Sequence, residues 1–156
     1  MKIKWKPLAV CMLLPLALGA VVSVITMNAM SAFETLQKPP LSPPGWLFPV
    51  VWTILYLIMG YASYRVWMSG NERRRDALQA YGFQLFLNLI WPLLFFSFGW
   101  YGISFAWLVA LWIAVLVTLL RFRAIDKTAG WLLAPYLVWL TFAGYLNLGV
   151  FLLNQK

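Results

Sequence analysis

The feature that most constrains this chain is the length of its uncharged, apolar runs. Four such runs cover residues 7–33, 39–64, 77–120 and 128–155. A helix needs about 20 apolar residues to cross a bilayer, so three of the runs have room for one spanning helix each. The 44-residue run 77–120 would be about 66 Å long as a single helix, more than twice the roughly 30 Å hydrocarbon layer, so it must fold back. Two glycines in the segment 97–102 predict the turn.

Composition supports a membrane location, because 63% of the residues are hydrophobic and only 10% are charged. The sequence therefore predicts an all-α integral membrane protein, a single domain over residues 1–156 with five transmembrane helices. The expected helices lie at roughly 7–29, 46–67, 79–97, 102–121 and 130–153, and a proline-rich lid loop at 30–45 joins the first two.

The basic residues test the helix count, since five helices put the two termini on opposite sides. Ten of the twelve lysines and arginines fall on the side of the N terminus and of the loops at 68–78 and 122–129. Only Lys38 and Lys156 fall on the other side. By the positive-inside rule, we expect a multi-pass protein of a bacterial inner membrane, with the N terminus cytoplasmic and the C terminus outside.

The formal net charge of +8 does not indicate nucleic-acid binding. The basic residues lie beside the membrane ends, where their expected partners are anionic lipid headgroups. The chain has no histidine and one cysteine, and its four acids lie in or beside loops. We therefore expect no metal site, no required cofactor and no buried acid–base pair at membrane depth.

Aromatic and polar side chains recur on one face of the second, third and fifth expected helices. Tyr56, Asn88 and Trp139 lie near mid-span, and the same faces carry Trp52, Trp91, Ala143 and Asn147. An amide at that depth must hydrogen-bond to another helix or line a cavity, because lipid offers no partner. Aromatic side chains from three helices form either a packed core or a flat-walled pocket, and periodicity leaves both open.

The first and fourth expected helices carry small residues at i, i+4 spacing. Gly19 and Ser23 lie in the first, and Ala110, Ala114 and Thr118 in the fourth. Small residues let helix backbones approach closely in a membrane. We expect these two helices to serve as scaffold.

Four ordered motifs carry a resemblance to a known family. They are Leu36-Gln37-Lys38-Pro39 with Pro43-Pro44, Phe48-Pro49-x-x-Trp52-Thr53-x-Leu55-Tyr56, Gln84-Leu85-x-Leu87-Asn88-x-x-Trp91-Pro92, and Pro135-Tyr136-x-x-Trp139-x-x-Phe142-Ala143-x-x-Leu146-Asn147. Over essentially its whole length the chain resembles the tryptophan-rich sensory proteins, whose animal members are the translocator proteins once called peripheral benzodiazepine receptors.

The resemblance implies a five-helix bundle, commonly a homodimer, with a pocket between the helices that the first long loop covers. Its expected ligands are protoporphyrin IX or haem, and also sterols and isoquinoline or benzodiazepine compounds. By motif, the pocket residues are Trp52, Tyr56, Asn88, Trp91, Trp139 and Ala143, and the lid residues are Lys38, Pro39, Leu41, Pro43, Pro44 and Trp46. A planar tetrapyrrole can stack on indole faces, and Lys38 is the cation nearest the mouth for its carboxylates.

The function implied by this resemblance is a membrane receptor or sensor that binds porphyrins and acts in tetrapyrrole or stress regulation. Two alternatives stay open: a light-dependent porphyrin-degrading enzyme, and a porphyrin or small-molecule transporter. The family often has an aromatic residue between its two proline pairs, where this chain has Leu41. We therefore expect the lid to cover the pocket without gripping the ligand.

Overall fold

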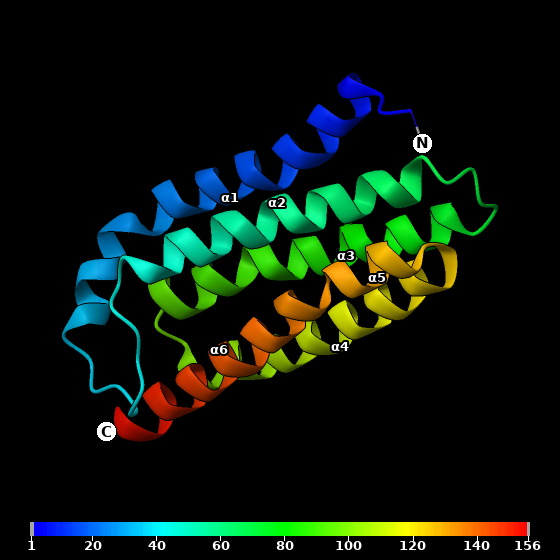
Figure 1. Ribbon diagram of the computed structural model, residues 1–156. Helices are drawn as coiled ribbons and strands as arrows, with labels where there is room; N and C mark the ends of the chain where they lie inside the picture. The colour runs from blue at the N-terminus through cyan, green and yellow to red at the C-terminus, as the bar shows by residue number, and fades with distance from the viewer. Residues whose placement is uncertain (1, 156) are drawn as a thin grey trace.

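The computed structural model describes residues 2–155, which form helices and connecting loops and no strand. In chain order the elements are α1 (Trp5–Glu34), α2 (Leu47–Trp67), α3 (Arg74–Pro92), the π-helix η1 (Leu93–Ser97), α4 (Tyr101–Ile125), α5 (Lys127–Leu132) and α6 (Ala134–Leu153) (Figure 1). Five helical stretches are long and apolar enough to cross a membrane, with α3 and η1 forming one and α5 and α6 another. The predicted fold class, a five-helix transmembrane bundle, is confirmed.

Several helices are longer than the bilayer argument required. α1 ends at Glu34, so residues 30–34 are helical where the lid loop was expected. No proline or glycine precedes Pro39 in this stretch, so nothing stops the helix earlier. α3 and α4 likewise extend through flanking arginines, because charged side chains are tolerated in helical turns that lie beyond the hydrocarbon layer.

The last membrane span is two helices where one, over residues 130–153, was expected. Asp126 is the N-cap of α5: its Oδ1 accepts a hydrogen bond from the backbone N–H of Ala129 at 3.1 Å. α5 ends at Leu132 because Pro135 has no N–H to continue the ladder, although it fits the first turn of α6.

The long apolar run folds back after η1. Phe98 N–H donates to the carbonyl of Leu93 at 3.0 Å, an i to i−5 bond that widens the last turn after Pro92. Gly99 then adopts a φ of +66°, which reverses the chain before α4 begins at Tyr101.

The helices form a bundle in which α1 packs on α2, α2 on α5, and α4 on α3, α5 and α6. Two ends can be distinguished in Figure 1. The basic end carries the N terminus, the α2–α3 loop and the α4–α5 junction, where Arg65 and Asp126 form an ion pair of 3.0 Å. The lid end carries the loop 35–46, the α3–α4 turn and the C-terminal end of α6. Lys156, predicted at the lid end, lies outside the described residues.

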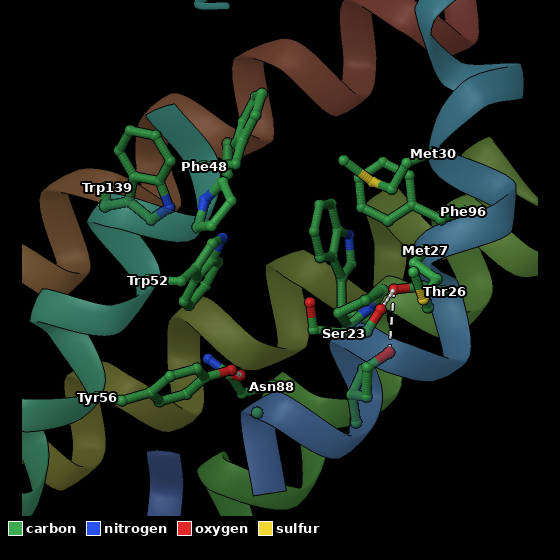
Figure 2. Close-up of a pocket in the computed structure, with 16 residues that line it drawn as sticks. Ser23, Thr26, Met27, Met30, Phe48, Trp52, Tyr56, Asn88, Phe96 and Trp139 are labelled. Carbon is green, nitrogen blue, oxygen red and sulfur yellow. Dashed lines mark hydrogen bonds between the residues drawn. The ribbon is translucent and has the colours of Figure 1, made fainter. Parts of the chain in front are cut away.

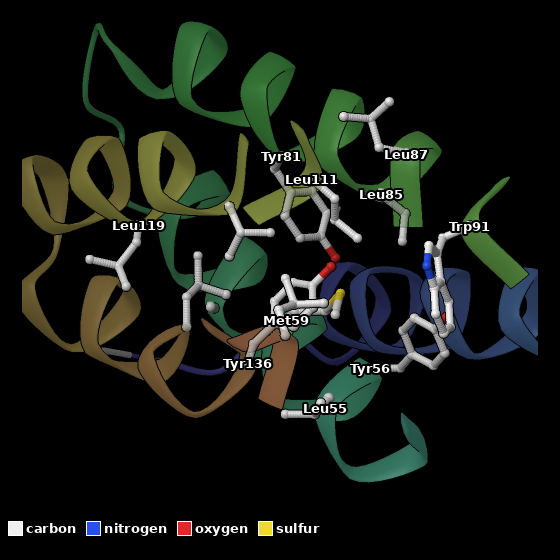
Figure 3. Close-up of a cluster of buried hydrophobic side chains, with 14 of the residues drawn as sticks. Leu55, Tyr56, Met59, Tyr81, Leu85, Leu87, Trp91, Leu111, Leu119 and Tyr136 are labelled. Atoms are coloured by element: carbon white, nitrogen blue, oxygen red, sulfur yellow. The ribbon is translucent and has the colours of Figure 1, made fainter. Parts of the chain in front are cut away.

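A closely packed seam joins α1 to α2 in the half of the bundle nearer the basic end. A Cβ atom on Gly60 would lie 2.5 Å from the carbonyl oxygen of Cys11 and 2.7 Å from the Cα of Met12. The two backbones therefore touch, which only glycine permits at this position. Beside the seam lies the buried core, which includes Met59, Tyr81, Leu111 and Tyr136 (Figure 3).

Substitution of Gly60 tests this seam. Gly60→Ala should destabilise the protein by about 1–3 kcal/mol, because the methyl group meets backbone atoms that cannot rotate away. Thermal unfolding in detergent measures the change. Gly82 of α3 is the matched control, since nothing lies within 4 Å of a Cβ there, and Gly82→Ala should be neutral or stabilising. Equal unfolding temperatures for the two variants would contradict the seam.

Candidate functional site

A cavity of about 330 Å³ lies in the lid-end half of the bundle, between α1, α2, α3 with η1, and α6 (Figure 2). The structure brings all six predicted pocket residues together on its walls: Trp52, Tyr56, Asn88, Trp91, Trp139 and Ala143. No charged side chain lines this cavity among residues 2–155, and its walls are mostly aromatic and aliphatic. Its volume is at the lower end of the range typical of small-molecule sites.

The cavity exists because α2 and α6 diverge. α2 packs closely on α5, but its backbone has little close contact with α6. The wedge between them is filled by side chains, with the Trp52 and Trp139 rings 6.4 Å apart at 87°. Trp52 also lies 5.7 Å from the ring of Tyr56. These side chains do not fill the whole wedge, and the space that remains is the cavity, with indole and phenol rings on its walls.

The floor of the cavity is a buried hydrogen-bond chain that joins three helices. Tyr56 Oη donates to Asn88 Oδ1 at 2.7 Å, and Asn88 Nδ2 donates to Tyr136 Oη at 2.6 Å. Tyr136 Oη in turn donates to Gln84 Oε1 at 2.7 Å. All four side chains are buried. Asn88, the amide that was expected at mid-span, therefore both lines the cavity and links α2, α3 and α6.

A second amide, Asn147, holds one wall of the cavity in position. Its Oδ1 accepts from Trp91 Nε1 at 2.9 Å and lies 3.1 Å from Ser104 Oγ. Its Nδ2 donates to the carbonyl of Tyr101 at 2.8 Å. Asn147 does not itself line the cavity. It fixes the edge of Trp91, a ring that lines the cavity and stacks on Phe95 at a centroid distance of 5.1 Å.

One buried donor on the wall has no partner within the described part of the chain. The Nε1–H of Trp139 is inaccessible to solvent and makes no hydrogen bond. A buried donor without a partner is costly, so Trp139 can offer a hydrogen bond to an acceptor on a molecule in the cavity.

An aromatic roof, formed by Phe33, Phe48, Phe96 and Trp139, closes the cavity toward the lid end. Phe33 at the end of α1 lies 6.4 Å from Phe48 and 5.3 Å from Phe96, measured between ring centroids. Phe48 lies 5.9 Å from Trp139. Lys38 sits above the roof, with its ammonium 4.9 Å from the centroid of Phe33. The cation therefore lies next to the cavity and not inside it.

The six predicted lid residues, Lys38, Pro39, Leu41, Pro43, Pro44 and Trp46, do not line the cavity. The lid instead docks on α6. Asn154 bonds both the N–H and the carbonyl of Gln37, at 3.1 and 2.7 Å, and Tyr145 Oη donates to the carbonyl of Pro40 at 2.7 Å. Leu41 is 84% exposed with a φ of +70°. The lid residues directly precede the cavity-lining helix α2 in the sequence, but their contacts with α6 hold them away from the cavity.

Sequence reasoning missed the wall that α1 provides. Gly19 and Ser23 were assigned to scaffold, but they line the cavity together with Val22, Thr26, Met27 and Met30. Gly19 also packs on the Tyr56 ring, which a Cβ would approach to 2.5 Å. The available signal was a face of small, hydroxyl and thioether side chains recurring every three or four residues, unlike the branched aliphatic residues around it.

The fold and this cavity define a class: a multi-pass helical membrane protein with an aromatic cavity between its helices. The model of the TspO/MBR family matches residues 11–153, and the chain belongs to this family. It is 40% identical to the tryptophan-rich protein TspO of Chlorobaculum tepidum over 150 residues, which are 94% of this chain and 95% of the relative. It is 37% identical to the tryptophan-rich sensory protein of Cereibacter sphaeroides, covering 78% of this chain and 76% of that protein. Against the translocator protein of Ovis aries, identity is 38%, over 79% of this chain and 75% of the relative.

Removal of the Asn88 amide tests the floor. Asn88→Leu keeps the side-chain size but leaves the buried hydroxyl of Tyr56 without its acceptor and Tyr136 with Gln84 as its remaining partner, so we expect a loss of about 1–3 kcal/mol. Unfolding in detergent or in SDS titrations measures it. Asn28→Leu is the control, because Asn28 is on α1, exposed, and its amide makes no hydrogen bond. A loss no greater than that of the control would show that the chain of bonds does not hold the helices together.

Proposed function

We propose that this protein is a membrane receptor or sensor that binds porphyrins, protoporphyrin IX or haem, in the cavity between its helices, and acts in tetrapyrrole or stress regulation. The observation that supports this most directly is the set of three indoles, Trp52, Trp91 and Trp139, around one uncharged cavity at membrane depth. Flat aromatic walls suit a flat aromatic ligand, because stacking gains both dispersion and quadrupole energy. Sterols and isoquinoline or benzodiazepine compounds share the apolar character this cavity would accept.

The polar groups around the cavity suit a ligand that is apolar at its centre and polar at its edge. Trp139 Nε1 has an unused hydrogen to donate, and the Lys38 ammonium lies over the roof at the lid end. A porphyrin stacked on the indoles would direct its carboxylates toward Lys38, where a cation and water can solvate them. No cofactor is needed for this binding role.

Substitution of Trp139 is the most direct test of the proposed porphyrin site. Trp139→Ala should weaken protoporphyrin IX binding about fivefold or more, since loss of one stacking partner costs roughly 1–3 kcal/mol. Quenching of tryptophan fluorescence by protoporphyrin IX in detergent or nanodiscs gives the apparent affinity. Trp5→Ala is the matched control, because Trp5 is 72% exposed and distant in sequence from the cavity residues, and it should leave the affinity unchanged. Equal affinities for the two variants would exclude the proposed site.

A second candidate function is light-dependent degradation of a bound porphyrin. The observation that favours it is the Trp52–Trp139 pair, whose rings lie 6.4 Å apart on the cavity wall, close enough for both to contact one macrocycle. Illumination of protoporphyrin IX with the protein distinguishes the candidates. If the porphyrin absorption band decays at the same rate with and without protein, the enzyme function is excluded and the receptor function is not.

We infer further that the basic end faces the cytoplasm of a bacterial inner membrane, and that the protein forms a homodimer there. The charge distribution supports the orientation, because among the described residues 2–155 Lys38 is the only lysine or arginine at the lid end. Light scattering of the detergent-solubilised protein tests the dimer.

Reporter fusions test the orientation. Alkaline phosphatase fused after residue 155 should be active and a fluorescent protein at the same position dark, because each folds only on its own side of the membrane. Insertion of the same reporters in the loop at residue 70 is the internal control and should give the opposite pattern. Fluorescence from the C-terminal fusion would contradict the proposed orientation and place the C terminus in the cytoplasm.

A further inference from the structure

Two parts of the structure adjoin the cavity and could move to open it: the lid loop, whose Lys38 lies over the aromatic roof, and α1, which lines the cavity. The lid is the more firmly attached of the two. Three hydrogen bonds join it to α6, two between Asn154 and Gln37 and one from Tyr145 to Pro40. Pro39 is buried and packs so closely on Gly149 that a side chain there would overlap its ring. Opening the lid would break all of these contacts without removing any residue from the cavity wall.

The lid-end half of α1, residues 16–33, is attached much more weakly. Within residues 2–155, no hydrogen bond joins this segment to another helix, since the hydroxyls of Thr26 and Ser31 bond to carbonyls of α1 itself. Of the thirty residues of α1 only Pro15 and Thr26 are buried, whereas the shorter α2 and α3 bury eight and seven. Lipid tails replace apolar contacts at little cost, so a helix held by packing alone is the easiest to displace in a membrane.

A hinge is present where this segment begins. Pro15 has no N–H, so the carbonyl of Cys11 lacks its usual partner within the helix. That carbonyl is the one that packs against Gly60 of α2. On the side nearer the basic end, α1 is further held by a 2.9 Å hydrogen bond from the Lys4 N–H to Tyr64 Oη. One half of α1 is therefore anchored through its backbone, whereas the other half, which packs on Tyr56 through Gly19 and on the aromatic roof through Phe33, is held by side-chain packing alone.

The pivoting half separates the cavity from the hydrocarbon layer. It contributes six lining residues, of which Ser23 and Met27 are exposed. Its outward side carries Leu18, Val21, Val24 and Ile25, all exposed and aliphatic. The wall is thus one helix thick, with lipid-compatible side chains on one side and the cavity on the other. The methionines Met27 and Met30 are flexible side chains that can repack around objects of different shape.

We propose that ligands reach the cavity from the hydrocarbon layer, by outward movement of the lid-end half of α1 about Pro15, while the lid stays docked on α6. The proposal rests on the proposed binding function and adds the ligand class, which is amphiphiles that partition into the bilayer. The same movement would enlarge the cavity, whose volume of about 330 Å³ is modest for a large planar ring.

Cross-linking of α1 tests the route. In a Cys11→Ser background, Phe33→Cys with Phe96→Cys places two thiols where the ring centroids are 5.3 Å apart, and a short bifunctional thiol reagent joins α1 to η1. The matched control, Gln37→Cys with Asn154→Cys, joins the lid to α6 at residues that do not line the cavity. Protoporphyrin IX in liposomes is the probe, and stopped-flow quenching of tryptophan fluorescence gives the rates. Each variant is compared with its own form before cross-linking, so the effect of the substitutions cancels.

We expect the α1 cross-link to slow association and dissociation at least tenfold, and the lid cross-link to change both rates less than twofold. Unchanged rates after α1 cross-linking would overturn the route, and so would slowing by the lid cross-link alone. If the proteins before cross-linking show no saturable quenching while the folded state is intact by circular dichroism, the binding function itself fails and the route with it. The two failures are therefore distinguishable.

Discussion

The structure depends on a chain of hydrogen bonds at membrane mid-depth, from Tyr56 through Asn88 and Tyr136 to Gln84. Lipid cannot satisfy polar groups, so these side chains must find one another, and in doing so they set the relative positions of α2, α3 and α6. This need for hydrogen-bond partners constrains the helix positions more than apolar packing does, because an apolar side chain can pack equally well on a helix or on a lipid tail. The cavity is built directly on this chain, because Tyr56 and Asn88 belong to both.

Once the floor is fixed, the geometry of the helices above it decides where space remains. α2 and α6 diverge toward the lid end, and bulky indoles fill the wedge imperfectly. Asn147 restrains Trp91, and the aromatic roof joins the ends of α1, α2 and η1 to α6. The walls on three sides are thus held by hydrogen bonds or by mutual aromatic packing, whereas α1 is held by neither along most of its lid-end half. Because α1 is attached less firmly than the other three walls, it is the wall that we propose to move.

The sequence could predict a large part of this arrangement. Apolar run length and charge distribution predicted five spanning helices, and the 3.6-residue periodicity placed Trp52, Asn88 and Trp139 on inward faces. It did not predict that α1 is a wall, because small residues such as Gly19 and Ser23 at this spacing favour plain helix packing. Nor could it place the lid, since the hydrogen bonds that dock Gln37 and Pro40 come from residues more than a hundred positions away.

What the sequence by itself determined is the class of protein, because the need to satisfy every backbone group in lipid leaves a long apolar run little choice but a spanning helix. It also determined which side chains are available at mid-depth. Whether those aromatic side chains form a filled core or a cavity was decided only by the tertiary structure. That outcome turns on the separation of α2 and α6 toward the lid end (Figure 1) and on the wall that α1 adds, and both result from contacts between residues far apart in the chain, which periodicity does not contain.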